Sequence, residues 1–139
     1  MNDCLFITYC SKKKLDYSNC GAQLLLPSDL YISSRVQTFI CFCKKHKYTW
    51  AIFSDYYGLV FENDKISWYD KSPNLVTDKE YYELLENTIN QLKNHNKIFF
   101  YYNSETFHLL YRRLVNDLKK HKYVILLDRL EVCGEERNE

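Results

Sequence analysis

The sequence predicts an α/β fold: a three-layer sandwich in which helices cover both faces of a four-stranded parallel sheet. Two observations lead to this fold class. Four short segments are nearly continuous apolar runs, which is typical of strands that are buried on both faces. Three segments with helical spacing lie between them, and strands that alternate with helices through right-handed crossovers form a parallel sheet. We expect the strand order 2-1-3-4, with the first strand central.

The expected strands are 5–9 (LFITY), 49–54 (TWAIFS), 97–102 (KIFFYY) and 123–127 (YVILL). The first helix is expected from Ser34 to about His46, because Ser34 and Gln37 have the spacing of a capping box. Thr77 and Glu80 repeat that spacing and predict the start of the second helix. The third helix is expected to begin after residue 103 or 104 and to end in the basic stretch 119–121, where cations suit the helix dipole.

Length and composition limit the classes of protein to consider. A chain of 139 residues fits one domain, which we place at 1–132, followed by a polar tail at 133–139. The net charge of +1 provides no long-range field that would attract nucleic acid in general. The sequence has no apolar run of about 20 residues and no basic leader at its start, so we expect a cytoplasmic protein without a membrane partner.

The cysteines and histidines give no sign of a metal or a disulfide framework. The six cysteines lack CxxC spacing and are expected to be free thiols. Cys41, Cys43 and His46 are close in sequence but do not share one face of a helix. We therefore expect no metal and no cofactor.

Two connections are too long for simple turns, 10–32 and 55–76. Loops of this length in a compact domain are usually functional or partly structured. Both leave the carboxyl ends of expected strands, which is the edge where open α/β sheets bind ligands. The first begins with CSKKK, where the Cys10 thiol, the Ser11 hydroxyl and three lysines are able to meet a polar or anionic ligand. The alternative is that Cys10 is a small buried hydrophobe and the lysines are solvated.

Three further polar segments lie on these connections. DLYISS places Tyr31, Ser33 and Ser34 just before the first helix, where free backbone amides favour an anion, although Ser34 is also a natural helix cap. FSDYYGLV places Ser54, Asp55, Tyr56 and Tyr57 before Gly58, directly after the second strand. ISWYD adds a carboxylate next to rings, at Trp68, Tyr69 and Asp70. No GxGxxG or Walker A pattern is present, so the standard dinucleotide and triphosphate sites are not indicated.

The ordered set CSKKK, DLYISS, FSDYYGLV and ISWYD resembles the prokaryotic family described as domain of unknown function 6884, over roughly residues 5–77. The same layout is distantly similar to the core domain of archaeosine synthase, which modifies a 7-deazaguanine base in tRNA. That domain's motifs correspond in part to residues of this sequence, namely Cys10, Lys13 or Lys14, Tyr31, and Ser33 or Ser34. The resemblance implies a pocket for a nucleobase or nucleotide-like ligand.

The leading hypothesis is a domain that binds a nucleotide or a modified, 7-deazaguanine-like nucleobase at the carboxyl edge of its sheet and acts in nucleic-acid modification. Cys10, Lys14 and Asp70 are the candidate catalytic residues: a thiol, an ammonium that stabilises charge or attacks, and a general base. The candidate ligand-binding residues are Ser11, Lys13, Tyr31, Ser33, Ser54, Gly58 and Tyr69. The alternatives are a non-catalytic ligand sensor, an accessory module for a nucleic-acid-processing protein, and a plain scaffold without a concave site; whether the protein is an enzyme stays open.

Overall fold

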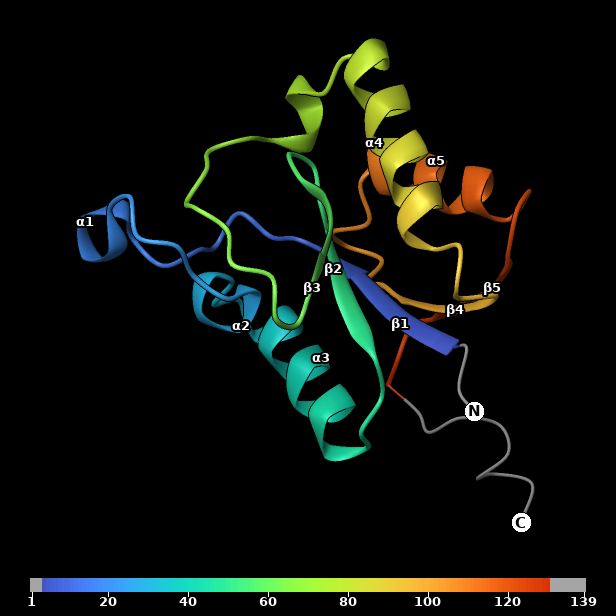
Figure 1. The fold of residues 1–139 in the computed structure, drawn as a ribbon, viewed down its shortest axis with the longest axis horizontal. Coiled ribbons are helices and arrows are strands. Elements are labelled where there is room, and N and C mark those ends of the chain that lie inside the picture. The colour runs from blue at the N-terminus through green and yellow to red at the C-terminus, as the bar shows by residue number, and fades with distance from the viewer. Residues whose placement is uncertain (1–3, 131–139) are drawn as a thin grey trace.

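A computed structural model describes residues 4–130. These residues form one five-stranded sheet in the order β3-β2-β1-β4-β5, with helices on both of its faces (Figure 1). The strands are β1 Cys4–Tyr9, β2 Trp50–Ser54, β3 Gly58–Phe61, β4 Lys97–Tyr101 and β5 Tyr123–Leu127. The α/β class is therefore confirmed.

The expectation of four strands, all parallel, was wrong because of β3. The four expected strands do pair in parallel with their neighbours, β2 with β1, β1 with β4, and β4 with β5. The chain then turns at Gly58, which has a positive φ of 83°, and β3 runs back antiparallel to β2. The sheet is mixed, and its order differs from the one expected because this hairpin adds an edge strand beside β2.

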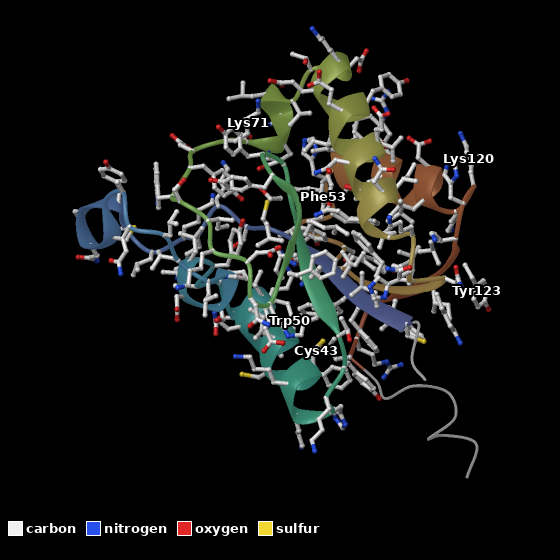
Figure 2. All side chains as sticks on the ribbon, in the orientation of Figure 1. Cys43, Trp50, Phe53, Lys71, Lys120 and Tyr123 are labelled. Carbon is white, nitrogen blue, oxygen red and sulfur yellow. The ribbon has the colours of Figure 1, made fainter. Side chains whose placement is uncertain are left out.

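Alternate side chains of β1 enter two separate cores, which explains why the strand reads as a continuous apolar run. Leu5, Ile7 and Tyr9 pack on the side of α4 Asp78–Gln91 and α5 Leu109–Leu118. Phe6 packs on the side of α3 Ser34–Lys45, together with Cys43 and Trp50, which Figure 2 labels. Short helices lie in the two long connections: α1 Tyr17–Cys20, α2 Pro27–Leu30 and the 3-10 helix η1 Pro73–Leu75.

The starts of the three long helices test the sequence-based boundaries. The capping box of Thr77 and Glu80 is present at the start of α4, as expected. The cap of α3 is Ser33 rather than Ser34, and its hydroxyl accepts from the Val36 amide. Helix α5 begins at residue 109, later than expected, because residues 103–106 form a turn that is held by hydrogen bonds to the Tyr9 hydroxyl.

Other expectations are tested only within the described residues. No disulfide joins the five cysteines among them, while Cys133 and the expected tail 133–139 lie outside the described part of the chain. No cluster of three metal-ligating side chains occurs in residues 4–130. Within the same range, no helix combines the length and the apolar character needed to cross a bilayer.

Candidate functional site

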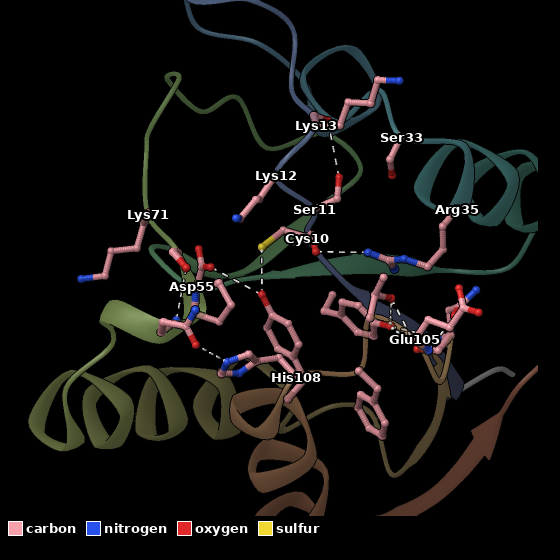
Figure 3. A pocket seen from close by; sticks show the side chains of 18 residues that line it. Cys10, Ser11, Lys12, Lys13, Ser33, Arg35, Asp55, Lys71, Glu105 and His108 are labelled. Atoms are coloured by element: carbon pink, nitrogen blue, oxygen red, sulfur yellow. Dashed lines mark hydrogen bonds between the residues drawn. The ribbon is translucent and has the colours of Figure 1, made fainter.

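A pocket of about 620 Å³ opens at the carboxyl edge of the parallel strands. This volume lies in the range of small-molecule sites, which runs from about 300 to 1,000 Å³. Five segments contribute its walls: the residues that end and follow β1, the start of α3, the residue after β2, the segment around η1, and the connection from β4 into the start of α5 (Figure 3). The lining residues are Tyr9, Cys10, Ser11, Lys12, Lys13, Ser33, Arg35, Asp55, Lys71, Ser72, Pro73, Asn74, Asn103, Glu105, Thr106, Phe107, His108 and Tyr111.

Asp55 is a buried carboxyl group in this pocket with one oxygen unpartnered. It directly follows the last residue of β2, and only 2% of its surface is exposed. Its Oδ2 accepts a hydrogen bond of 3.4 Å from the Tyr111 hydroxyl, whereas no hydrogen-bond donor among the described residues reaches Oδ1. Buried carboxylate oxygens are rarely left without a donor, because the loss of hydration is not offset. The Oδ1 atom is therefore an acceptor that a ligand is able to satisfy.

The Cys10 thiol lies in the same hydrogen-bonded chain. Its Sγ is 3.6 Å from the Tyr111 hydroxyl, which in turn donates to Asp55 (Figure 3). Burial and the nearby Asp55 carboxylate both raise the pKa of the Cys10 thiol. Burial also raises the pKa of Asp55, against the opposing effect of the Lys14 ammonium. At neutral pH Cys10 is thus held as a thiol, which favours a hydrogen-bonding role over attack as a thiolate.

Arg35 occupies the opposite side of Cys10 from Asp55 in Figure 3. It lies in the first turn of α3, and its guanidinium is fixed by two hydrogen bonds, 2.7 Å to the Thr8 hydroxyl and 3.1 Å to the Cys10 carbonyl. The guanidinium also lies 3.9 Å from the centroid of the Tyr9 ring. Burial lowers the pKa of Arg35. A fixed cation therefore marks one end of the pocket.

Aromatic rings form a rigid wall of the pocket. The Tyr9 ring stacks on Tyr111 at 4.5 Å and on Phe107 at 5.8 Å between centroids. The Tyr9 hydroxyl accepts a hydrogen bond from the Asn103 amide, which ties this wall to the chain that follows β4. Tyr9 is 1% exposed and Tyr111 3%, whereas Phe107 is half-buried, so Phe107 is the ring of this wall with the most surface left for a ligand.

A further wall of the pocket contains His108 and is formed by the segment around η1 and the start of α5. The His108 Nδ1 accepts from the Leu110 amide, so the ring proton is on Nε2, which donates to Asn74 Oδ1 at 2.6 Å. Lys71 is held in place by an ion pair of 3.0 Å with Glu80. These contacts connect the pocket to the starts of α4 and α5.

A protein-family model described as "Family of unknown function (DUF6884)" matches residues 5–132. The chain belongs to this family. No curated protein and no solved structure matches the chain. The similarity to archaeosine synthase stays an expectation from the sequence motifs.

Four of the residues predicted from the sequence line the pocket of this DUF6884 protein: Cys10, Ser11, Lys13 and Ser33. They come from the end of β1 and from the residue that caps α3, the two places where strand-end and helix-start reasoning apply most directly. Their predicted roles in binding and catalysis stay predictions.

The other six predicted residues do not line it. Tyr31, Ser54 and Tyr69 form a buried hydroxyl cluster, in which the Ser54 hydroxyl donates to Tyr69 at 3.1 Å. The Lys14 Nζ lies 4.5 Å from the centroid of the Tyr69 ring. Gly58 faces α4, and Asp70 is exposed.

Sequence reasoning did not select the residues that give the DUF6884 pocket its polarity, Asp55 and Arg35. Asp55 belongs to the polar segment after the second strand, but Ser54 and Gly58 were chosen from that segment instead. Arg35 stands next to the residues that were chosen as the helix start, and nothing in its spacing distinguishes it from a solvated side chain. The sequence places Tyr9 and Tyr111 on apolar segments, where core residues are expected. Both are indeed buried, and each also contributes to the pocket wall.

Proposed function

We propose that the pocket binds a nucleobase or nucleotide and that this ligand's ring N–H groups meet Asp55. A 7-deazaguanine-like base and a role in nucleic-acid modification belong to the same proposal, through the motif resemblance. The observation that carries it is the buried, unpartnered Oδ1 of Asp55 in a pocket with aromatic walls. Nucleobases combine a planar ring with N–H donors on one edge, which suits both features.

The chemistry of the lining favours binding over covalent catalysis. Cys10 is held as a thiol, and its contacts in the pocket are with Tyr111 and Asp55 rather than with a histidine. The imidazole nitrogens of His108 are both engaged, one with the Leu110 amide and one with Asn74. The residues that line the pocket therefore contain no preformed pair of cysteine and histidine, in keeping with the ligand-sensing or accessory role that the sequence left open.

The test is isothermal titration of the purified protein with guanosine, 7-deazaguanosine, adenosine, uridine and their 5′-monophosphates. At least one of these ligands is expected to bind, and Asp55→Asn should weaken it by about tenfold or more, as expected for loss of a hydrogen bond to a charged group. Asp70→Asn is the matched control, because Asp70 is an exposed carboxylate outside the pocket. Absence of binding by all the ligands would overturn the proposal.

A further inference from the structure

The Arg35 guanidinium has no acidic counter-ion. Its two hydrogen-bond acceptors, the Thr8 hydroxyl and the Cys10 carbonyl, are both neutral. No ion pair joins it to a carboxylate among residues 4–130. Arg35 is half-buried, and a cation removed from water without a counter-charge is costly. An anion in the pocket would relieve this cost.

The guanidinium also keeps hydrogen-bonding capacity in reserve. Arginine carries five N–H donors, and the contacts to Thr8 and Cys10 use one on Nη1 and one on Nη2. The stacking on Tyr9 fixes the plane of the group, so little side-chain entropy is lost when an anion binds. Lys12 and Lys13 also line the pocket, but in Figure 3 Lys12 lies on the Asp55 side of Cys10 and the Lys13 ammonium points away, so Arg35 is the cation at its own end.

The two ends of the pocket differ in the groups that they accept. Asp55 and Arg35 lie on opposite sides of Cys10, so an N–H donor suits one end and an anion suits the other (Figure 3). We infer that the Arg35 end is a phosphate subsite, and that the ligand is a nucleobase carrying a phosphate ester rather than a free base or nucleoside. This inference rests on the proposed function and names the class of its ligand. The phosphate ester has two possible sources, a free nucleotide and a nucleotide within a nucleic-acid strand.

Glu105 supplies a sensitive control for this subsite. It is an exposed carboxylate that lines the pocket and lies on the Arg35 side in Figure 3, but it makes no ion pair with Arg35. Its negative charge opposes an incoming phosphate. Removal of that charge should strengthen phosphate binding without any change to the buried parts of the site.

The experiment compares guanosine, GMP, the dinucleotide GpG and inorganic phosphate by isothermal titration on three proteins: wild type, Arg35→Met and Glu105→Gln. For the wild type, GMP should bind at least about tenfold more tightly than guanosine, as expected for a charge-assisted hydrogen bond. Arg35→Met should abolish this preference, so that the variant binds GMP no more tightly than it binds guanosine. Glu105→Gln should increase the affinity for the phosphate-bearing ligands but not for guanosine, and it keeps the test valid if Arg35→Met fails to fold.

Each outcome has a distinct meaning. Equal affinity for guanosine and GMP would overturn the phosphate subsite while the proposed function stands. Inorganic phosphate that binds through Arg35, when none of the nucleosides and nucleotides binds, would support the anion site and overturn the nucleobase function. Absence of all binding would overturn both. Binding of GpG as tight as that of GMP would support the subsite with a strand as the phosphate source, and binding of GMP alone would support it with a free nucleotide.

Discussion

The hydroxyl groups of Tyr31 and Tyr69 lie 2.6 Å apart in the interior, although 38 positions separate them in the sequence. Tyr31 belongs to the connection between β1 and α3, and Tyr69 to the connection between β3 and η1. The Ser54 hydroxyl donates to Tyr69 and accepts from the amides of Tyr56 and Tyr57. The cluster therefore fastens both long connections to the end of β2, beside the pocket.

Tyr69→Phe should destabilise the protein by about 1–3 kcal/mol, because it leaves the buried Ser54 donor and Tyr31 hydroxyl without their partner. Chemical denaturation measures the difference. Tyr31→Phe combined with Tyr69→Phe should cost less than the sum of the two single changes, since both hydroxyls are then removed together.

Tyr56→Phe is the matched control for this cluster. The Tyr56 ring stacks on Tyr69, but the residue is 56% exposed, so loss of its hydroxyl should change stability very little. A Tyr69→Phe variant as stable as Tyr56→Phe would show that the buried hydroxyls do not hold the connections.

Asp55→Asn should change the pH dependence of stability. Burial raises the pKa of Asp55 in the folded state above its ordinary value of 3.8, so folding disfavours the carboxylate form. The wild type should therefore lose stability relative to Asp55→Asn as pH rises above 3.8, until the folded-state pKa is passed. Denaturation curves of both proteins from pH 3 to 8 measure this difference.

Asp70→Asn serves as the control for that measurement, because it also removes one carboxylate, from an exposed position outside the pocket. If the curve of Asp55→Asn is parallel to that of the wild type, the carboxyl group is not desolvated in the folded protein. The pocket would then lack its buried acceptor.

Gly58→Ala should destabilise the protein more than Gly21→Ala. Both glycines have positive φ, where an added Cβ costs about 1–2 kcal/mol. At Gly58 the new Cβ would also lie 3.1 Å from the Asn87 amide nitrogen, whereas at Gly21 it would meet nothing within 4 Å. Thermal unfolding of the two variants separates the effect of backbone strain from that of the steric conflict with α4. Equal losses of stability in the two variants would contradict the close packing of the hairpin on that helix.

Cys10 should react slowly with iodoacetamide at pH 8, well after the exposed Cys41. It is 5% exposed, and burial and Asp55 raise the pKa of its thiol, so the reactive thiolate is scarce. Mass spectrometry of peptides from the labelled protein follows each cysteine separately. Labelling of Cys10 as fast as Cys41 would indicate an activated thiolate and would restore the covalent role considered from the sequence.

The parallel strands were predictable because each contributes side chains to two cores, which forces a continuous apolar run. Strand β3 was not, because its four residues, GLVF, are too short a run to distinguish from a loop. What defines it is pairing with β2 together with the Gln91 side chain, which bonds both the amide and the carbonyl of Leu59 along the sheet edge. Such contacts join distant parts of the chain and leave no local pattern.

The site was predictable at the level of its edge but not of its polarity. Strand-end reasoning led to Cys10 and Ser11, which line the pocket. Tyr31 and Tyr69 were expected to face a ligand, but their hydroxyls satisfy each other in the interior. The sequence shows which side chains carry polar groups, whereas only the packed structure shows that Asp55 lines the pocket with an unpartnered oxygen.

The central position of β1 also determines when the protein is able to finish folding as it is synthesised. The Thr8 hydroxyl bonds the Tyr101 carbonyl across 93 residues, and the whole of β4 pairs with β1. At translation rates of about 5–20 residues per second, β1 waits roughly 5–20 s for this partner. Throughout that interval one flank of an apolar strand stays open to other nascent chains. Slower elongation should therefore lengthen the time during which this strand is exposed to aggregation.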